Sequence, residues 1–317
     1  MRQRIFLFVF LFPFFVTSVQ GQQVSQRIIL DTDISSDADD VGAMAVLHTL
    51  SREESIEILA IMVSSSDPWS PQAVYAINKY FGKPEIPIGV VPQDGVSHKS
   101  SYSRALAEIE PALLFSGRSS FDLYRKILSN QPDKSVTIVT IGYLTNLHDL
   151  LISEADQYSP LSGLELVDQK ARLLVTMGGD YPQGKEWNFI QDPEASKRAV
   201  ENWPTKIIFV GYTLGLNILT GQTLQKAEES CPIRLAYQLH NNFSGRPSWD
   251  QLAVLYALLT DRKRDELFTV STPGQNTIQA DGSNVWNEKL DGVHHVLGLR
   301  ADPEQVAERI ENLMRNR

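Results

Sequence analysis

Cysteine, basic charge and long apolar stretches are all scarce in this sequence. Among 317 residues the only cysteine is Cys231, which excludes an internal disulfide. Asp and Glu number 38 against 29 Lys and Arg, and the net charge of −9 argues against a nucleic-acid partner, which needs a basic surface. Beyond the N-terminal segment, no apolar run approaches the roughly twenty residues that cross a bilayer. Stability must therefore come from an apolar core and from any bound metal.

The N-terminal segment predicts export. Residues 1–4 are basic, residues 5–16 are apolar and rich in Phe and Leu, and residues 17–21 offer small side chains for cleavage. This pattern is typical of a secretory signal peptide over residues 1–21, and the apolar run is too short for an ordinary membrane span. An uncleaved anchor is the alternative. We expect one mature domain, residues 22–317, in the periplasm or outside the cell, without membrane association once the signal is removed.

Strands and helices alternate along the mature chain without a linker. Apolar runs predict strands at 28–30, 56–64, 86–91, 136–141, 171–177, 206–210 and 293–299. Helical patterns lie at 72–81, 105–114, 121–129, 147–153, 193–202, 224–229, 233–243, 249–259 and 303–315. The polar residues 98–103 predict a surface loop. This order predicts a single α/β domain with a mostly parallel central sheet flanked by helices.

Residues 27–50, RIILDTDISSDADDVGAMAVLHTL, combine a short strand, an acidic turn and a helix. The turn holds Asp31, Asp33, Asp37, Asp39 and Asp40, the last two in the first turn of the helix. Two carboxylates about 4 Å apart repel by roughly 4 kcal/mol at an effective dielectric of about 20. A helix dipole offsets only about 0.3–1 kcal/mol for each of them. The turn therefore predicts a site for a hard cation, Ca²⁺ or Mg²⁺; the alternative is a solvated loop in which Asp39 caps the helix.

Other acidic motifs fit this turn poorly. An EF-hand loop starting at Asp31 needs Gly at its sixth position and Glu at its twelfth, where this chain has Ser36 and Gly42. A phosphatase of the haloacid dehalogenase type shares the D-x-D of Asp31 and Asp33, but we find no matching downstream lysine and second acidic pair. The chain also has no G-x-S-x-G elbow, P-loop or dinucleotide fingerprint.

The residues that follow each predicted strand indicate where chemistry takes place, because the carboxyl ends of parallel strands share one edge. Gly142 follows the strand at 136–141 and allows close approach of a ligand. The strand at 171–177 leads to Glu186 and Asn188, and Asp250 begins a later helix. We expect a carboxylate-rich edge with few candidate bases other than Asp and Glu.

Four blocks, taken together, resemble the inosine–uridine-preferring nucleoside hydrolases, which cleave N-glycosidic bonds of ribonucleosides. They are IILDTD…DD at 28–40, TIGYLTN at 140–146, MGGDYPQGKEWNFIQDPEA at 177–195 and WDQLAVLYAL at 249–258. The first and third blocks are specific, and the match covers nearly the whole mature chain. The resemblance implies hydrolysis of ribonucleosides to ribose and free base, a Ca²⁺ cofactor, a small nucleoside substrate, and a homodimer or homotetramer.

The resemblance also implies roles for individual residues. The implied metal ligands are Asp33, Asp40, the carbonyl of Ile141 and Asp250. Asp33 is in addition the implied general base toward the Ca²⁺-bound water. The implied substrate contacts are Asp39 to the ribose 2′-hydroxyl, Glu186 and Asn188 to ribose hydroxyls, and Met177 beneath the sugar, with Asp31 as a supporting aspartate. A negative pocket suits the oxocarbenium-like transition state of glycosidic cleavage.

The chain departs from the family pattern in its acidic turn. The family turn usually reads D-x-D-P-G-x-D-D, whereas this turn is two residues longer and contains the extra Asp37. This leaves open whether Asp37 takes the role of Asp39 or Asp40. The Asn that usually follows the second strand in the family, after Ser64 and Ser65, is replaced here by Ser66 or Asp67.

The group that protonates the leaving base is unassigned. Trp249 stands where base-tolerant family members have a His, so we take it as a candidate that either stacks on the base or packs in the core. His98, in a polar loop, is a further candidate. The alternative functions are a non-catalytic, metal-dependent binder of ribosyl or other sugar ligands and, less favoured, the phosphohydrolase.

Overall fold

The computed structural model describes residues 26–92, 94–111 and 118–316. The predicted signal peptide, residues 1–21, lies outside the described residues, as do residues 22–25. Within the described ranges, no helix has the length and apolar character needed to cross a membrane.

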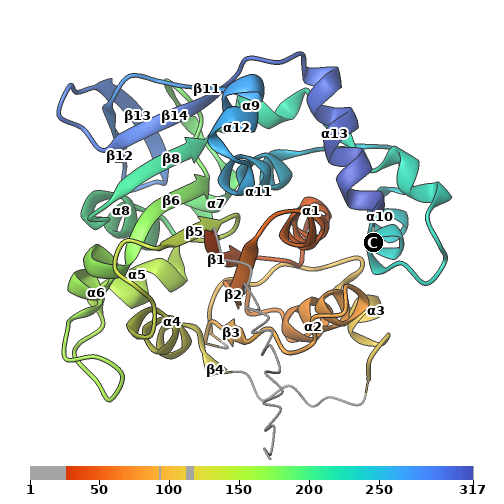
Figure 1. Ribbon diagram of the computed structural model, residues 1–317, viewed down its shortest axis with the longest axis horizontal. Helices are drawn as coiled ribbons and strands as arrows, with labels where there is room; N and C mark the ends of the chain where they lie inside the picture. Colours follow the sequence, from red (N-terminus) through yellow and green to blue (C-terminus); the bar gives the residue numbers. More distant parts are fainter. Residues whose placement is uncertain (1–25, 93, 112–117, 317) are drawn as a thin grey trace, which may run out of the picture.

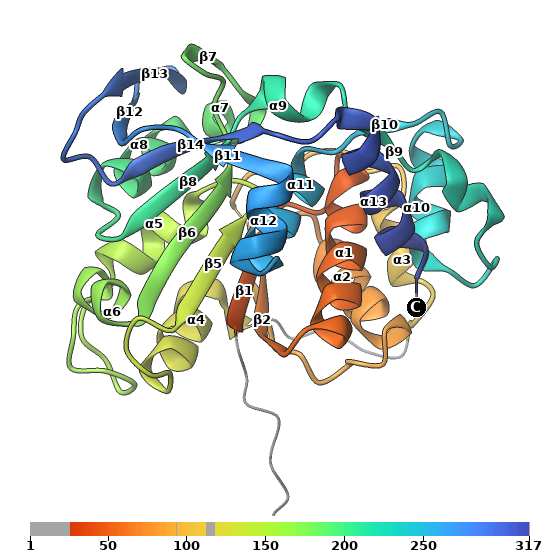
Figure 2. The ribbon, with the colours of Figure 1, turned by 45° about the horizontal axis from the view of Figure 1, so that its top comes forward.

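A twelve-stranded sheet runs through the centre of the part of the chain that the structure describes (Figure 1, Figure 2). Its order is β4-β3-β2-β1-β5-β6-β8-β14-β12-β13-β7, with β11 paired to β14. Neighbours from β4 to β14 are parallel, and β7, β11, β12 and β13 pair antiparallel. The strands are β1 (Gln26–Thr32), β2 (Ile56–Val63), β3 (Ile88–Val90), β4 (Arg118–Ser119), β5 (Val136–Thr140), β6 (Ala171–Met177), β7 (Gln183–Lys185), β8 (Lys206–Val210), β11 (Phe268–Val270), β12 (Gly274–Ile278), β13 (Ser283–Glu288) and β14 (His294–Leu299). The predicted α/β domain with a mostly parallel sheet is confirmed.

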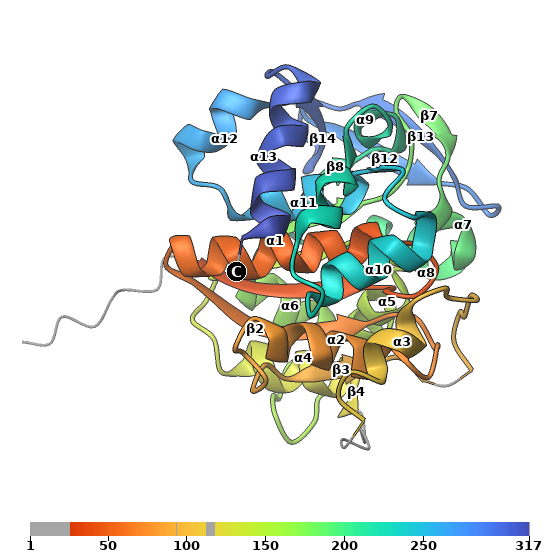
Figure 3. The same ribbon diagram turned by 90° about the vertical axis from the view of Figure 1, so that its right-hand side faces the viewer.

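Helices cover both faces of this sheet (Figure 1, Figure 3). One face carries α1 (Asp39–Glu53), α2 (Ser70–Tyr80), α11 (Trp249–Leu258) and α13 (Pro303–Arg315), and the other carries α4 (Ser120–Ser129), α5 (Thr145–Ile152), α6 (Gly163–Lys170) and α8 (Pro193–Asn202). The remaining helices are α3 (Ser103–Ala107), α7 (Trp187–Gln191), α9 (Tyr212–Leu216), the 3₁₀ helix η1 (Gln222–Lys226), α10 (Pro232–Asn241) and α12 (Asp261–Leu267). A separate two-stranded sheet pairs β9 (Leu219–Thr220) with β10 (Arg246–Pro247). Each face has its own apolar core.

Helix α1 is buried along most of its length. It begins at Asp39, as predicted, and residues 39–50 are all buried. Helices α11 and α13 both pack on α1, so more than one side of the helix is covered (Figure 3). As a consequence, the two aspartates of its first turn are buried at the carboxyl edge of the sheet.

Several local predictions were wrong. The helix expected at 224–229 is the shorter 3₁₀ helix η1, and the helix expected at 105–114 ends at Ala107 in α3, with residues 112–114 outside the described ranges. In the predicted surface loop at 98–103, Tyr102 and Ser103 are buried, and the Tyr102 hydroxyl donates to the carbonyl of Asp37. The short antiparallel strands were not predicted, because their side chains are half-exposed and show no apolar run.

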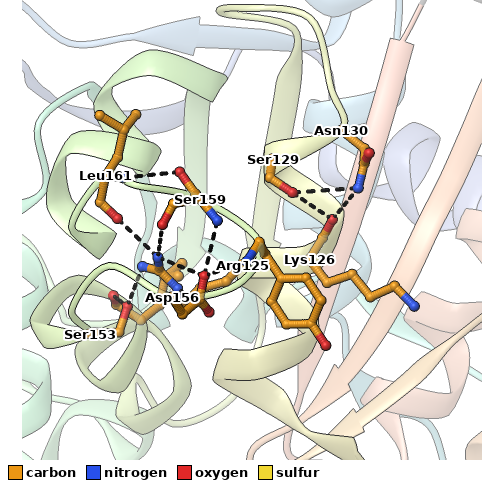
Figure 4. Close-up of polar contacts among 10 residues, drawn as sticks. Arg125, Lys126, Ser129, Asn130, Ser153, Asp156, Ser159 and Leu161 are labelled. Carbon is orange, nitrogen blue, oxygen red and sulfur yellow. Dashed lines mark hydrogen bonds and ion pairs between the residues drawn. The ribbon is translucent and has the colours of Figure 1, made fainter.

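A buried arginine organises the loop between α5 and α6 (Figure 4). Arg125 is 1% exposed; its Nε donates to Asp156 at 2.7 Å, and its terminal nitrogens donate to the hydroxyl of Ser153 and the carbonyl of Leu161, both at 2.9 Å. Each of these groups would otherwise need a water partner. The network anchors the segment that leads into β6.

Candidate active site

A cavity of about 310 Å³ lies at the carboxyl ends of the central strands. Its lining residues are Asp33, Ser36, Asp37, Asp39, Asp40, Ile141, Met177, Glu186, Trp187, Asn188, Tyr212, His240, Arg246, Trp249 and Asp250. This set includes every residue that the sequence predicted as a catalytic, substrate-binding or metal-binding residue. The fold therefore brings these residues to one place, while the role of each stays a prediction.

Three carboxylates converge at the floor of the cavity. Asp39 and Asp40 come from the first turn of α1, and Asp250 comes from the first turn of α11. One oxygen from each lies within 4.8 Å of the others, and all three side chains are buried. The packing of α1 against α11 brings two helix N-termini together, and both favour negative charge. Asp33, from the loop after β1, also acts electrostatically on Asp40.

The carboxyl groups of this cluster have higher pKa values than ordinary carboxyl groups. Burial, followed by repulsion from neighbouring carboxylates, raises the pKa of Asp39, Asp40 and Asp250 well above the usual value. Burial raises the pKa of Asp33 to about 7. A positive ion among these oxygens would reverse the repulsion, and a buried all-oxygen set suits a hard divalent cation. The residues present therefore fit a metal of this kind.

Glu186 and Asn188 are held rigidly on the opposite wall. Glu186 caps α7 and accepts backbone N–H bonds from Asn188 at 2.7 Å and Gly179 at 3.0 Å. Burial raises its pKa to about 7, although these backbone donors oppose that rise. The Asn188 amide donates to the carbonyls of Ile141, at 3.3 Å, and Met177, at 3.2 Å, at the ends of two neighbouring strands. Asn188, one of the two implied ribose-binding residues, is thus hydrogen-bonded to the carbonyl of Ile141, the implied metal ligand.

Gly142 lies against the loop that carries Asp33. A Cβ atom at this position would lie 2.4 Å from the backbone nitrogen of Asp33 and 2.7 Å from the Ser64 hydroxyl. The glycine therefore allows close approach of the loop that carries Asp33, and the approach of a ligand to its backbone stays a prediction. The next residue, Tyr143, is fully buried; its hydroxyl lowers the pKa of Asp33 but makes no well-formed hydrogen bond with the described residues.

Trp249 is packed into the cavity wall. It is 8% exposed, its indole Nε1 donates to the carbonyl of Tyr212 at 2.7 Å, and its ring stacks on the Tyr212 ring with centroids 5.3 Å apart. The Arg246 guanidinium lies 5.0 Å from the Trp249 centroid. Tyr212 and Trp187 are 39% and 46% exposed. These two residues, rather than Trp249, present open aromatic surface in the cavity.

Asp31 lies near the end of β1 and does not line the cavity. Its carboxylate accepts a hydrogen bond from the hydroxyl of Tyr124 at 2.8 Å and another from the amide of Asn146 at 3.0 Å. Burial raises its pKa to about 7. This placement suits the supporting part that the resemblance implies.

Ser66 and His98 also lie outside the cavity lining. The Ser66 hydroxyl donates to the carbonyl of Gly95 at 2.7 Å. The His98 Nε2 lies 2.8 Å from the side-chain oxygen of Gln191, and its ring lies beside that of Trp187, with centroids 4.8 Å apart. His98 therefore borders the cavity through Trp187.

The sequence did not single out Tyr212, His240 or Arg246. Arg246 forms a two-pronged ion pair with Asp37, with Nε at 2.8 Å from one oxygen and Nη2 on the other. His240 Nε2 lies 3.6 Å from the same carboxylate. No local pattern signals this group, because Asp37 and Arg246 are 209 positions apart. Asp37 is thus held by a cation, outside the three-carboxylate floor.

Fold and cavity define an α/β protein with a buried oxygen-donor site at the edge of a parallel sheet, a class in which ligands bind beyond the strand ends. The sequence model of the inosine-uridine preferring nucleoside hydrolases matches residues 28–305, and the chain belongs to this family of N-glycosyl hydrolases. No curated protein matches the chain in direct sequence comparison.

Solved structures share the fold at low sequence identity. An inosine-uridine preferring nucleoside hydrolase from Bacillus anthracis superposes with a TM-score of 0.69 at 17% identity, covering 92% of this chain and 99% of that one. A purine-preferring ribonucleoside hydrolase from Gardnerella vaginalis gives the same four values. The type III effector XopQ, complexed with adenosine diphosphate ribose, gives 0.67 at 14% identity over 93% of each chain.

Proposed function

We propose that this chain hydrolyses the N-glycosidic bond of ribonucleosides, releasing ribose and a free base. The observation that carries the proposal is the convergence of Asp33 and the three-carboxylate floor with Glu186 and Asn188 in one cavity. The family and the fold both support this reaction. Buried carboxylate and amide groups discriminate well for a ligand rich in hydroxyls.

Ca²⁺ is the proposed cofactor, held by Asp33, Asp40, Asp250 and the carbonyl of Ile141. When bound, such an ion supplies positive charge that acidifies and orients a water molecule. Asp33 would accept the proton of the attacking water as the general base. The floor carboxylates stabilise the positive charge that develops on the sugar.

The sugar and the base would occupy different walls of the cavity. Asp39, Glu186 and Asn188 bind ribose hydroxyls, and Met177 lies beneath the ring. The exposed rings of Tyr212 and Trp187 provide flat surfaces for the base. Trp249 acts by supporting Tyr212, since its own N–H already has a partner.

A panel of purine and pyrimidine nucleosides tests the proposal directly. The wild-type protein should hydrolyse members such as inosine or uridine, and Asp33→Ala should lose about 10²–10⁴-fold in rate, the usual contribution of a general base. A thermal melt checks that the variant stays folded. Removal of divalent ions with a chelator should suppress hydrolysis, and calcium should restore it; full activity without any divalent ion would contradict the metal mechanism.

The panel also separates the rival functions. A wild type that binds nucleosides without turnover would indicate a non-catalytic binder. Release of phosphate from phosphate esters would indicate a phosphohydrolase. We propose secretion or periplasmic location from the N-terminal segment alone, and N-terminal sequencing of the exported protein would show whether residues 1–21 are removed.

A further inference from the structure

The extra aspartate of the long acidic turn has a partner that bears on the metal site. Among the described residues that line the cavity, six carry carboxyl groups and Arg246 alone carries a permanent positive charge, His240 being the other basic residue. The guanidinium acts electrostatically on Asp39 and Asp250 as well as on Asp37. Without a restraint, it is therefore a ready internal counter-ion for the floor carboxylates.

Asp37 provides that restraint. The Nε and Nη2 atoms of the guanidinium donate to the two oxygens of its carboxylate, and the backbone N–H of Ala38 donates to one of these oxygens at 2.6 Å. The Tyr102 hydroxyl fixes the backbone of Asp37 from α3. A planar, two-pronged arginine–carboxylate pair is geometrically specific, so these guanidinium nitrogens are bonded to Asp37 and not to the floor carboxylates.

We propose that the Asp37–Arg246 ion pair sets the affinity of the site for its divalent cation, because Asp37 prevents the guanidinium from neutralising the floor carboxylates. The inference rests on the proposed metal-dependent function. In this inference Asp37 acts on the metal site indirectly, by positioning the guanidinium of Arg246. A direct metal bond from Asp37 is not required.

Removing the negative charge of Asp37 and removing the positive charge of Arg246 should therefore change the calcium affinity in opposite directions. Asp37→Asn keeps an oxygen for the Ala38 N–H but frees Arg246 to pair with Asp39 or Asp250, so calcium should bind about tenfold more weakly. Arg246→Gln leaves Asp37 as one more unpaired carboxylate, so calcium should bind about tenfold more tightly. The double variant should return to within about threefold of the wild type, because both charges are gone.

The measurement is a calorimetric titration of the metal-free protein with calcium chloride, which needs no turnover. The matched control is Glu194→Gln, which breaks the exposed Glu194–Arg198 pair on α8 and should leave the dissociation constant unchanged. Thermal melts of the metal-free variants identify loss of folding. Weaker binding in both single variants, or an unchanged constant in both, would overturn the inference.

Failure of the inference is distinguishable from failure of the proposed function. A wild type that binds calcium and hydrolyses no nucleoside would refute the reaction while the opposite-sign pattern still stands. A wild type that hydrolyses nucleosides and shows additive losses in the variants would refute the charge role alone. A wild type that binds no calcium would overturn the inference itself.

Discussion

The indole N–H of Trp249 donates to the backbone carbonyl of Tyr212 at 2.7 Å, and the two rings stack with an interplanar angle of 19°. This arrangement links the helix that carries Asp250 to α9, which begins at Tyr212. Since Trp249 is buried and Tyr212 is partly open, the pair works as a supported platform whose exposed ring faces the cavity. A flat base placed there would contact Tyr212.

Tyr212→Ala should therefore weaken the binding of nucleosides with large bases. Stacking of a base on an aromatic ring is worth about 1–3 kcal/mol, so KM for inosine should rise about tenfold or more, with a smaller rise for uridine. Tyr212→Phe keeps the ring and is the matched control, expected to behave as wild type. Steady-state kinetics on both substrates decide the matter; equal losses for the two bases would speak against a platform.

Gly142→Ala should damage both stability and activity. The added methyl group would lie 2.4 Å from the Asp33 nitrogen, so the backbone of one of the two loops has to shift. Overpacking of this kind costs about 1–3 kcal/mol. The shift also displaces Asp33, and a small misplacement of a reacting group is costly in rate. Urea unfolding and nucleoside kinetics measure the two effects; Gly82→Ala, where the added Cβ meets open space but the φ of +75° adds strain, shows the cost of backbone strain alone.

The metal-free protein should lose stability as pH rises. Glu186 and Asp31 have pKa values raised by burial to about 7 from ordinary values of 4.5 and 3.8. A carboxyl group whose folded pKa is raised contributes stability below its unfolded pKa, and this contribution is lost as pH rises through the folded pKa. The melting temperature of the protein in the presence of a chelator should therefore fall as the pH rises from about 4 to about 8. Glu186→Gln removes one such group and should flatten the decline; an equal decline in both proteins would exclude Glu186 as a source.

Arg125→Ala should destabilise the fold without changing the cavity. The guanidinium is 1% exposed and bonded to Asp156, and loss of one partner of a buried pair costs about 3–5 kcal/mol. Asp156 remains partly open to water, so we expect the lower end of this range, as measured by urea unfolding. Arg104→Ala removes an exposed pair with Glu108 and should cost about 0–1 kcal/mol.

The Arg125–Asp156 ion pair should also make the stability of the fold depend on pH in the acid range. The Arg125 hydrogen bond lowers the pKa of Asp156 to about 2. A lowered folded pKa gives stability above the unfolded value of 3.8, and this stability is lost as pH falls toward the folded pKa. The difference in unfolding free energy between wild type and Arg125→Ala should therefore shrink below about pH 4. A constant difference across that range would indicate that packing alone is responsible.

Much of the architecture follows from local sequence. Buried parallel strands read as continuous apolar runs, so β8 and β6 were predicted with their observed bounds, and so were α8 and α13. The start of α8 was recognisable because Asp192 precedes a proline and accepts from the N–H of Ala195. The antiparallel strands were missed because edge strands with half-exposed side chains carry no such pattern.

The sequence alone indicated that the aspartates, Glu186 and Asn188 lie at one edge of the sheet, because they follow recognisable strands or begin helices, but it did not indicate Tyr212, His240 or Arg246. Only the tertiary structure decided which of these groups lie next to one another. Packing of α1 against α11 brings Asp250 to Asp39 and Asp40, although it is more than two hundred positions away. The partner of Asp37 is 209 positions away, and Trp249 is packed against Tyr212, which is 37 positions away. Local patterns record which groups reach the edge of the sheet, but their distances and charge partners arise only when distant segments pack together.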